Sequence, residues 1–155
     1  MSIVVYGASG PAGGERALAY RLLEIALERE HGLTRRPEIL RGPYGKPWFP
    51  AFPHIHFNLS HSRGAAVCAL SDAPVGIDIE VLREPPRRLA AGMGAEEFFR
   101  LWTAKEATVK LRGQSILACR GQIEPDKRCQ CLDGFLSGCI VTVCPGPAHT
   151  VRIEE

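Results

Sequence analysis

The sequence predicts a mixed α+β fold in a single domain. Residues 13–32 and 95–113 carry apolar side chains at helical spacing, and the short runs around them are apolar or alternating, as is typical of strands. A helix followed by strands occurs twice in this order, which favours α+β and suggests two similar halves. The chain of 155 residues fits one domain, and a domain of this size buries about 68–70% of its unfolded surface, which is enough for a core.

The first elements have clear local signals. Residues 2–7 (SIVVYG) are a short apolar run and predict a strand. In the helix that follows, Leu18, Leu22 and Ile25 keep helical spacing, and Gly32 suits its C-terminal cap. The stretch RPEILRGPYGKPWFP is rich in Pro and Gly, so we expect an extended loop there.

The central strands are predicted by alternation and by a turn. Residues 55–62 and 64–72 read as two strands joined at Arg63 and Gly64, and residues 73–81 read as a third.

The C-terminal part predicts a second helix and a hairpin. Residues 82–94 form a polar connector with two prolines, and the helix after it ends at Gly113. Residues 135–155 predict a terminal hairpin.

Composition excludes several classes of protein. A formal net charge of +2 does not indicate a nucleic-acid partner. No apolar run approaches the roughly 18 residues that a membrane helix needs. The N-terminus lacks the basic segment and long apolar core of a secretory signal, so we expect a cytoplasmic protein.

The six cysteines are expected to be reduced thiols in that compartment. Five lie in the C-terminal third, and their spacings match none of the usual zinc patterns; they are Cys119, Cys129, Cys131, Cys139 and Cys144. We interpret them as small buried hydrophobic residues.

The glycine-rich stretch GASGPAGG, residues 7–14, allows a dinucleotide-binding hypothesis. A strand, a G-x-x-G-x-x-G run and a helix open many such folds. That fold also needs an acidic residue that closes a second strand, but Glu38 precedes an apolar pair instead. A plain strand, turn and helix is the favoured interpretation, and a small oxidoreductase remains the alternative.

The run VGIDIE, residues 75–80, alternates strictly. On a strand, Asp78 and Glu80 share a face about 7 Å apart, because side chains alternate with period two. One interpretation is an edge strand with its acidic residues in water. The other is a site for a hard divalent cation such as Mg²⁺, which prefers carboxylate oxygens and offsets their repulsion.

The helical run LWTAKEATVK adds further charged groups. Glu106 and Lys110 are four residues apart, which by itself predicts only a helix-surface ion pair. Lys105 and Trp102 crowd the same stretch, and this crowding favours Glu106 as a third metal carboxylate and Lys110 as a phosphate ligand.

Two further motifs contain groups that suit phosphate. In FNLSHS, His61 lies between Ser60 and Ser62 at the end of a predicted strand. In GKPWFP, Lys46 lies on a stiff loop. Taken singly, these are an ordinary turn histidine and a solvated lysine.

Together and in this order, GKPWFP, FNLSHS, VGIDIE and LWTAKEATVK resemble the motif series of the Sfp-type 4′-phosphopantetheinyl transferases. The resemblance spans roughly Arg16 to Gly113. It implies two similar α+β halves around a pseudo-twofold axis, at about residues 1–80 and 81–155 of one domain (1–155), with the N-terminal half shortened.

The resemblance also implies an activity. Family members transfer the 4′-phosphopantetheine arm of coenzyme A to a serine of an acyl or peptidyl carrier protein and release adenosine 3′,5′-bisphosphate. The implied metal ligands for Mg²⁺, or for Mn²⁺, are Asp78, Glu80 and Glu106, with Glu106, Lys110 and Asp78 as the catalytic set. The implied coenzyme A contacts are Lys46, Ser60, His61, Lys105, Lys110 and Arg16. Glu106 is the candidate acceptor for the serine proton.

Two departures from the family pattern stand out. The basic segment that usually precedes the first helix is reduced to GASGPAGG, so Arg16 and Arg21 are the available substitutes. In the connector, no glutamate stands in clear register with the family's proposed base; the candidates are Glu84, Glu96 and Glu97. A non-catalytic binder of coenzyme A or of a carrier protein is therefore the main rival hypothesis. Plausible contacts for an acidic carrier are Arg83, Arg87 and Arg88.

Overall fold

The computed structural model describes residues 2–115 and 123–154, and within them it has three helices and nine strands. The helices are α1 (Glu15–His31), α2 (Arg87–Ala90) and α3 (Ala95–Arg112). The strands are β1 (Ile3–Ser9), β2 (Leu40–Arg41), β3 (Pro47–Trp48), β4 (His56–Ser62), β5 (Ala65–Ser71), β6 (Gly76–Val81), β7 (Gln130–Cys131), β8 (Cys139–Cys144) and β9 (His149–Arg152). The predicted mixed α+β class is confirmed.

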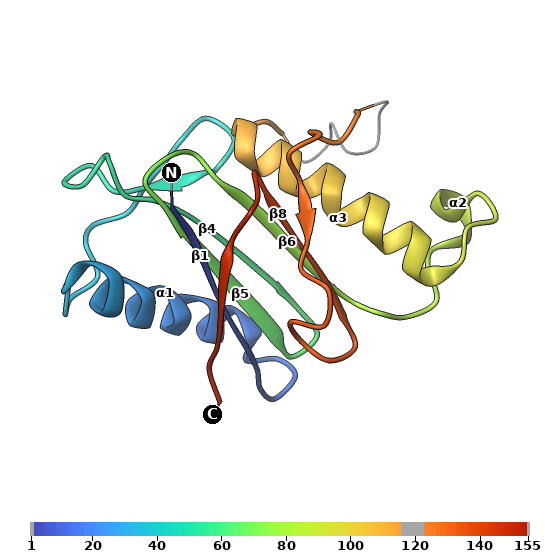
Figure 1. Ribbon diagram of the computed structural model, residues 1–155, viewed down its shortest axis with the longest axis horizontal. Helices are drawn as coiled ribbons and strands as arrows, with labels where there is room; N and C mark the ends of the chain where they lie inside the picture. The colour runs from blue at the N-terminus through green and yellow to red at the C-terminus, as the bar shows by residue number, and fades with distance from the viewer. Residues whose placement is uncertain (1, 116–122, 155) are drawn as a thin grey trace.

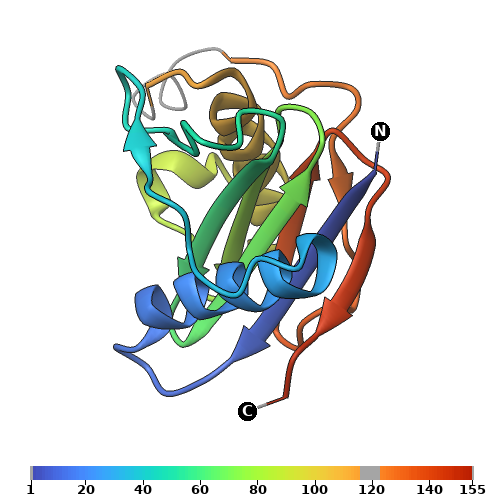
Figure 2. The same cartoon turned by 90° about the vertical axis from the view of Figure 1, so that its left-hand side faces the viewer.

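Two sheets form the centre of the molecule. The first has the strand order β4-β5-β1-β9, the second has the order β6-β8-β7, and β2 and β3 form a separate small ribbon. Helix α1 crosses one face of the first sheet, and α3 packs on β6 and β8 of the second (Figures 1 and 2). The edge strands β4 and β6 therefore lie side by side between the two helices.

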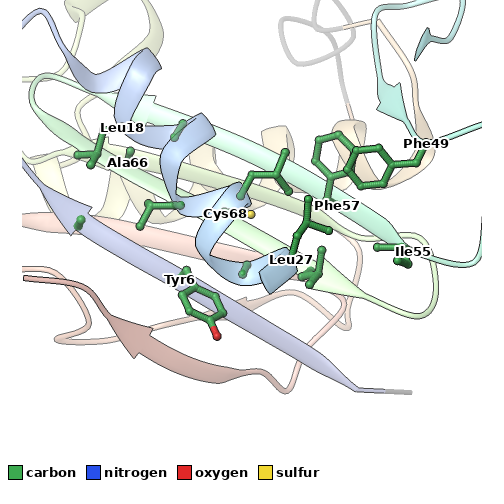
Figure 3. Packing of buried hydrophobic residues seen from close by; sticks show 14 residues of the cluster. Tyr6, Leu18, Leu27, Phe49, Ile55, Phe57, Ala66 and Cys68 are labelled. Carbon is green, nitrogen blue, oxygen red and sulfur yellow. The ribbon is translucent and has the colours of Figure 1, made fainter. Parts of the chain in front are cut away.

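The apolar core has two main parts, one below α1 and one that joins the two sheets. Below α1, buried side chains of the helix meet those of β1, β4 and β5, and the rings of Phe49 and Phe57 stack with centroids 4.5 Å apart (Figure 3). A second cluster joins β1 and β5 to β6 and β8, and it includes Val75, Ile77 and Ile79. The three apolar residues of VGIDIE thus lie together on a buried face, as the alternation of the run indicates.

Most predicted elements are confirmed, with their caps. Gly32 and Gly113 end α1 and α3 in the left-handed conformation, with φ of 68° and 63°. The turn at Arg63 and Gly64 joins β4 to β5. Two segments predicted as irregular contain short elements, namely β2 and β3 within residues 36–50 and the single turn α2 within residues 82–94.

The predicted hairpin at residues 135–155 is wrong. Strand β8 lies between β6 and β7, so both of its hydrogen-bonding edges are already occupied. Strand β9 instead joins the other sheet and pairs in parallel with β1.

The βαβ unit that the dinucleotide hypothesis requires is not formed at β1. Its neighbours are β5, which is antiparallel, and β9, which comes from the far end of the chain. No helix among the described residues is both long and apolar enough to cross a membrane.

Candidate metal centre

The two sheets are joined by side chains rather than by a backbone ladder. The side chains of alternate β4 residues face β6 and accept hydrogen bonds from its backbone N–H groups. The pairs are Asn58 Oδ1 with the N–H of Ile77 (2.8 Å), Ser60 Oγ with that of Ile79 (3.2 Å) and Ser62 Oγ with that of Val81 (3.3 Å). We call these three pairs the seam. The polar side chains of FNLSHS thus provide acceptors for the backbone N–H groups along the edge of β6, which would otherwise lack hydrogen-bond partners.

Three carboxylates meet where α3 crosses β6. Asp78 and Glu80 share one face of the strand, as predicted, and Glu106 approaches from the helix. Each of the three offers one oxygen, and these oxygens lie within 4.8 Å of one another. This is the only such cluster of potential metal ligands in the described part of the chain.

Asp78 is the most buried of the three, with 2% of its surface exposed. Its Oδ1 accepts hydrogen bonds from Ser60 Oγ (3.0 Å) and from Lys110 Nζ (3.1 Å). Lys110 also donates to the carbonyl oxygen of Ile77 (3.0 Å). The other oxygen, Oδ2, is fully buried, and when Glu106 is ionised it has no hydrogen-bond donor among the described residues. A buried carboxylate oxygen without a partner is unfavourable, so it is suited to a cation.

Lys110 does not form the helix-surface ion pair with Glu106 that its spacing alone predicts. Its ion pair is made across to Asp78 on β6, and no ion pair with Glu106 is formed within the described residues. The lysine links the helix to the strand instead of stabilising the helix alone.

Glu106 has an environment that opposes its ionisation. Burial, and then the neighbouring Asp78, raise the pKa of Glu106 to about 9. Without added positive charge, this third carboxyl group stays protonated at neutral pH. The donor set contains only oxygen, as Mg²⁺ and Mn²⁺ prefer, so the residues fit such an ion.

Glu80 lies at the solvent side of the cluster and is held by two donors. Its Oε2 accepts from Ser62 Oγ (3.2 Å) and from Arg83 Nη1 (2.9 Å). Sequence reasoning considered Arg83 only as a contact for a carrier protein and did not connect it with Glu80. The spacing of three residues between them was the available signal.

Lys46 is placed against the end of α3. Its Nζ donates to the carbonyl oxygens of Val75 (3.0 Å), Leu111 (3.2 Å) and Lys110. The last carbonyls of a helix lack partners within the helix, so the lysine satisfies them. Burial lowers the pKa of Lys46 to about 8.

The other predicted phosphate contacts do not all lie together. His61 is exposed and is on the opposite face of β4 from Ser60; it interacts electrostatically with Glu15, the residue before Arg16 at the start of α1. Lys46 is close to His56, at the other end of β4. Five residues of strand correspond to about 17 Å between these two ends. Lys105 is half-buried on α3, next to Glu106.

A cleft of about 240 Å³ opens beside Lys46 and Lys110, between α1, the β2–β3 ribbon and the end of α3. Sequence reasoning did not select the other polar groups in it, including Tyr20 and Arg41, whose Nη2 donates to the Tyr20 hydroxyl at 3.0 Å. Their nearness depends on tertiary packing, and no local motif signals it. Glu84, Glu96 and Glu97 are exposed and lie outside the carboxylate cluster.

The cysteines that the structure describes are free thiols, as expected. Cys68 and Cys144 are buried, whereas Cys129, Cys131 and Cys139 are half-buried. Cys119 lies outside the described residues. Within the described part of the chain, these thiols do not form a group of three potential metal ligands.

Comparison with known proteins gives a consistent result. No family model matches the chain. It is 43% identical over 129 residues to the 4′-phosphopantetheinyl transferase AcpT of Salmonella typhimurium, which covers 70% of this chain and 65% of that protein. It is 36% identical over 120 residues to the 4′-phosphopantetheinyl transferase gsp of Aneurinibacillus migulanus, with 66% and 48% covered. It is 32% identical over 89 residues to the 4′-phosphopantetheinyl transferase Sfp of Bacillus subtilis, with 47% and 40% covered. The matched part of the chain thus spans 40–65% of the length of these relatives.

Proposed function

The chain belongs to the 4′-phosphopantetheinyl transferase superfamily, and we propose that it transfers 4′-phosphopantetheine from coenzyme A to a serine of an acyl or peptidyl carrier protein in a Mg²⁺-dependent reaction. The observation that carries the proposal is the cluster of Asp78, Glu80 and Glu106 with Lys110 beside it. Two features of the cluster support a cation: the raised pKa of Glu106, and the buried Oδ2 of Asp78, which has no donor once Glu106 is ionised.

The chemistry follows from where charge develops. The serine oxygen forms a bond to the phosphorus that carries the pantetheine arm, and the bond from that phosphorus to the bridging oxygen breaks. Adenosine 3′,5′-bisphosphate leaves with the electron pair. A Mg²⁺ ion, when bound, would supply positive charge to the pyrophosphate oxygens and to the leaving group.

The protein's own residues would bind the cation, orient the substrate and accept the serine proton. Asp78, Glu80 and Glu106 would hold the cation, and Lys110 would offer its ammonium to a phosphate oxygen. Glu106 is our candidate acceptor for the serine proton, because a bound cation would favour its ionised form, and only that form can accept a proton.

For coenzyme A, we propose the cleft beside Lys46 and Lys110, with Lys105, Ser60, His61 and Arg16 as further candidates. The hydrogen bonds of Lys46 to three carbonyl oxygens and of Ser60 to Asp78 support positioning roles for both. His61 is exposed, which favours a direct contact with coenzyme A over a positioning role.

The proposal includes the architecture that the resemblance implies. It treats residues 1–155 as one domain whose halves, about 1–80 and 81–155, are related by a pseudo-twofold axis, and it places the protein in the cytoplasm. A carrier or coenzyme A binder without catalysis is the second candidate, because the match spans only part of each relative. The complete carboxylate cluster favours catalysis, since binding alone does not need it.

The test is transfer measured by intact mass. The protein is incubated with coenzyme A, Mg²⁺ and apo carrier proteins from fatty-acid, polyketide and nonribosomal peptide systems, with a chelator control. We expect a carrier to gain one phosphopantetheine arm only with the metal, and Asp78→Ala to abolish the gain. Glu28→Ala, an exposed change on α1, is the matched control. Bound coenzyme A without any mass gain would establish the binder instead.

A further inference from the structure

We propose that Arg83, together with Ser62, is a positioning residue that holds Glu80 in the orientation needed for metal binding. The inference rests on the proposed function, because it concerns the metal centre of the same site. Arg83 would thereby affect the metal affinity of the site without being a metal ligand itself.

Arg83 is fixed at three points. Its Nη1 donates to Glu80 Oε2 and to the carbonyl oxygen of Val81, each at 2.9 Å. Its guanidinium carbon lies 4.7 Å from the ring centroid of Phe99, which is buried on α3. A guanidinium that stacks on an aromatic ring and also donates to two acceptors has little freedom. Arg83 therefore connects the end of β6 to the helix that carries Glu106.

Ser62 supplies the second donor to the same carboxylate oxygen. Its Oγ lies 3.2 Å from Glu80 Oε2, and it also accepts the N–H of Val81 across the seam. Because Oε2 has both Arg83 and Ser62 as donors, Oε1 is the oxygen left for a cation. The side chain of Glu80 is 17% exposed and that of Arg83 is 30% exposed, so the pair is only partly screened by solvent.

Arg83 also balances charge in a crowded site. Lys110 neutralises Asp78, and Arg83 neutralises Glu80, so neither carboxylate on β6 is left unpaired before a cation arrives. The simple Coulomb effect of Arg83 on a bound cation is repulsive, and its removal by itself would tighten binding. If Arg83 positions Glu80, its removal should instead weaken binding, because removing a residue that hydrogen-bonds to a metal ligand usually lowers metal affinity 10–100-fold. The sign of the change therefore separates the two effects.

The experiment measures Mn²⁺ binding to the full chain without coenzyme A, by calorimetry and by the loss of the free Mn²⁺ spin-resonance signal. The variants are Arg83→Met, Arg83→Lys and Ser62→Ala. The control is Arg87→Met, an exposed arginine of α2. Thermal melts and circular dichroism check folding, and if Arg83→Met does not fold, Ser62→Ala and Arg83→Lys carry the test.

We expect Mn²⁺ affinity to fall at least tenfold in Arg83→Met, to fall less in Ser62→Ala, and to be partly restored in Arg83→Lys. Arg87→Met should match the wild type. Equal or tighter binding by Arg83→Met and Ser62→Ala would overturn the inference and leave the metal centre intact. Absence of Mn²⁺ binding by the wild type would instead overturn the metal centre of the proposed function, and this inference with it.

Discussion

Gly76 of β6 packs directly against the backbone carbonyl of Ala107 on α3, and a Cβ at position 76 would collide with that oxygen and with the N–H of Leu111. The glycine of VGIDIE therefore permits the close approach of helix and strand. This approach brings Glu106 of the helix to Asp78 and Glu80 of the strand.

Gly76→Ala is expected to destabilise the protein by about 1–3 kcal/mol or more, because the obstructing atoms are backbone and the helix must shift. Urea unfolding measures the change, and Mn²⁺ affinity should fall with it. Gly94→Ala is the matched control, since a Cβ there has nothing within 4 Å. Equal stability of the two variants would refute the close-packing argument.

Lys110→Met is expected to cost about 3–5 kcal/mol of unfolding free energy, because it leaves the buried Asp78 carboxylate without its cation. A helix-surface pair would be worth only a few tenths of a kcal/mol. The double variant Asp78→Asn with Lys110→Met should recover part of the lost unfolding free energy, which would show that the two side chains are energetically coupled. Arg112→Met, an exposed residue near the same helix end, is the control. A loss no larger than that of the control would show that the pair with Asp78 contributes little.

The metal-free protein should lose stability as pH rises, through Glu106. The unfolded chain ionises this group above its ordinary pKa of 4.5, whereas the folded state keeps the proton up to about 9. Between these values the unfolded state binds fewer protons, so the free energy of unfolding falls with rising pH. The fall is up to roughly 4 kcal/mol between pH 5 and pH 8, at 1.36 kcal/mol per unit. Urea titrations in chelator should show this slope in the wild type and a weaker one in Glu106→Gln. Parallel curves would show that Glu106 ionises normally.

Cys129 is expected to react with iodoacetamide before Cys131 and Cys139 at neutral pH. The hydrogen bond with Cys144, and then that with Thr108, lower the pKa of Cys129 to about 7, whereas burial raises the pKa of Cys131 and of Cys139. The thiolate is the reactive form, so the rate should rise through pH 7. Peptide mass spectrometry measures the rate at each thiol, and Thr108→Val should slow it at Cys129. Labelling of all three thiols at one rate would contradict the assignment.

Much of the site could be predicted because its signals are local. Strict alternation in VGIDIE predicted that Asp78 and Glu80 share one face of a strand, and the structure buries Val75, Ile77 and Ile79 on the other face. A glycine after the last helical turn marked the end of α3, and the spacing within the helix placed Glu106 and Lys110 close together.

The remaining features depend on contacts between distant segments. The three carbonyl partners of Lys46 come from the residue before β6 and from the end of α3, and no motif near the lysine encodes them. The placement of β9 was missed because four exposed or half-exposed residues do not indicate which strand they will pair with. The seam was missed because a serine that accepts an N–H across two sheets has the same local sequence as one in a turn.

The seam makes the carboxylate centre a product of assembly rather than of either sheet. A chain in which only one sheet has formed lacks either the strand that carries Asp78 and Glu80 or the serines that orient them. A divalent cation would bind only the arrangement in which the two sheets are packed together, so it would stabilise the packing of β4 against β6. Hydrogen exchange at the N–H groups of Ile77, Ile79 and Val81, which are the donors across the seam, should therefore slow when Mg²⁺ is added.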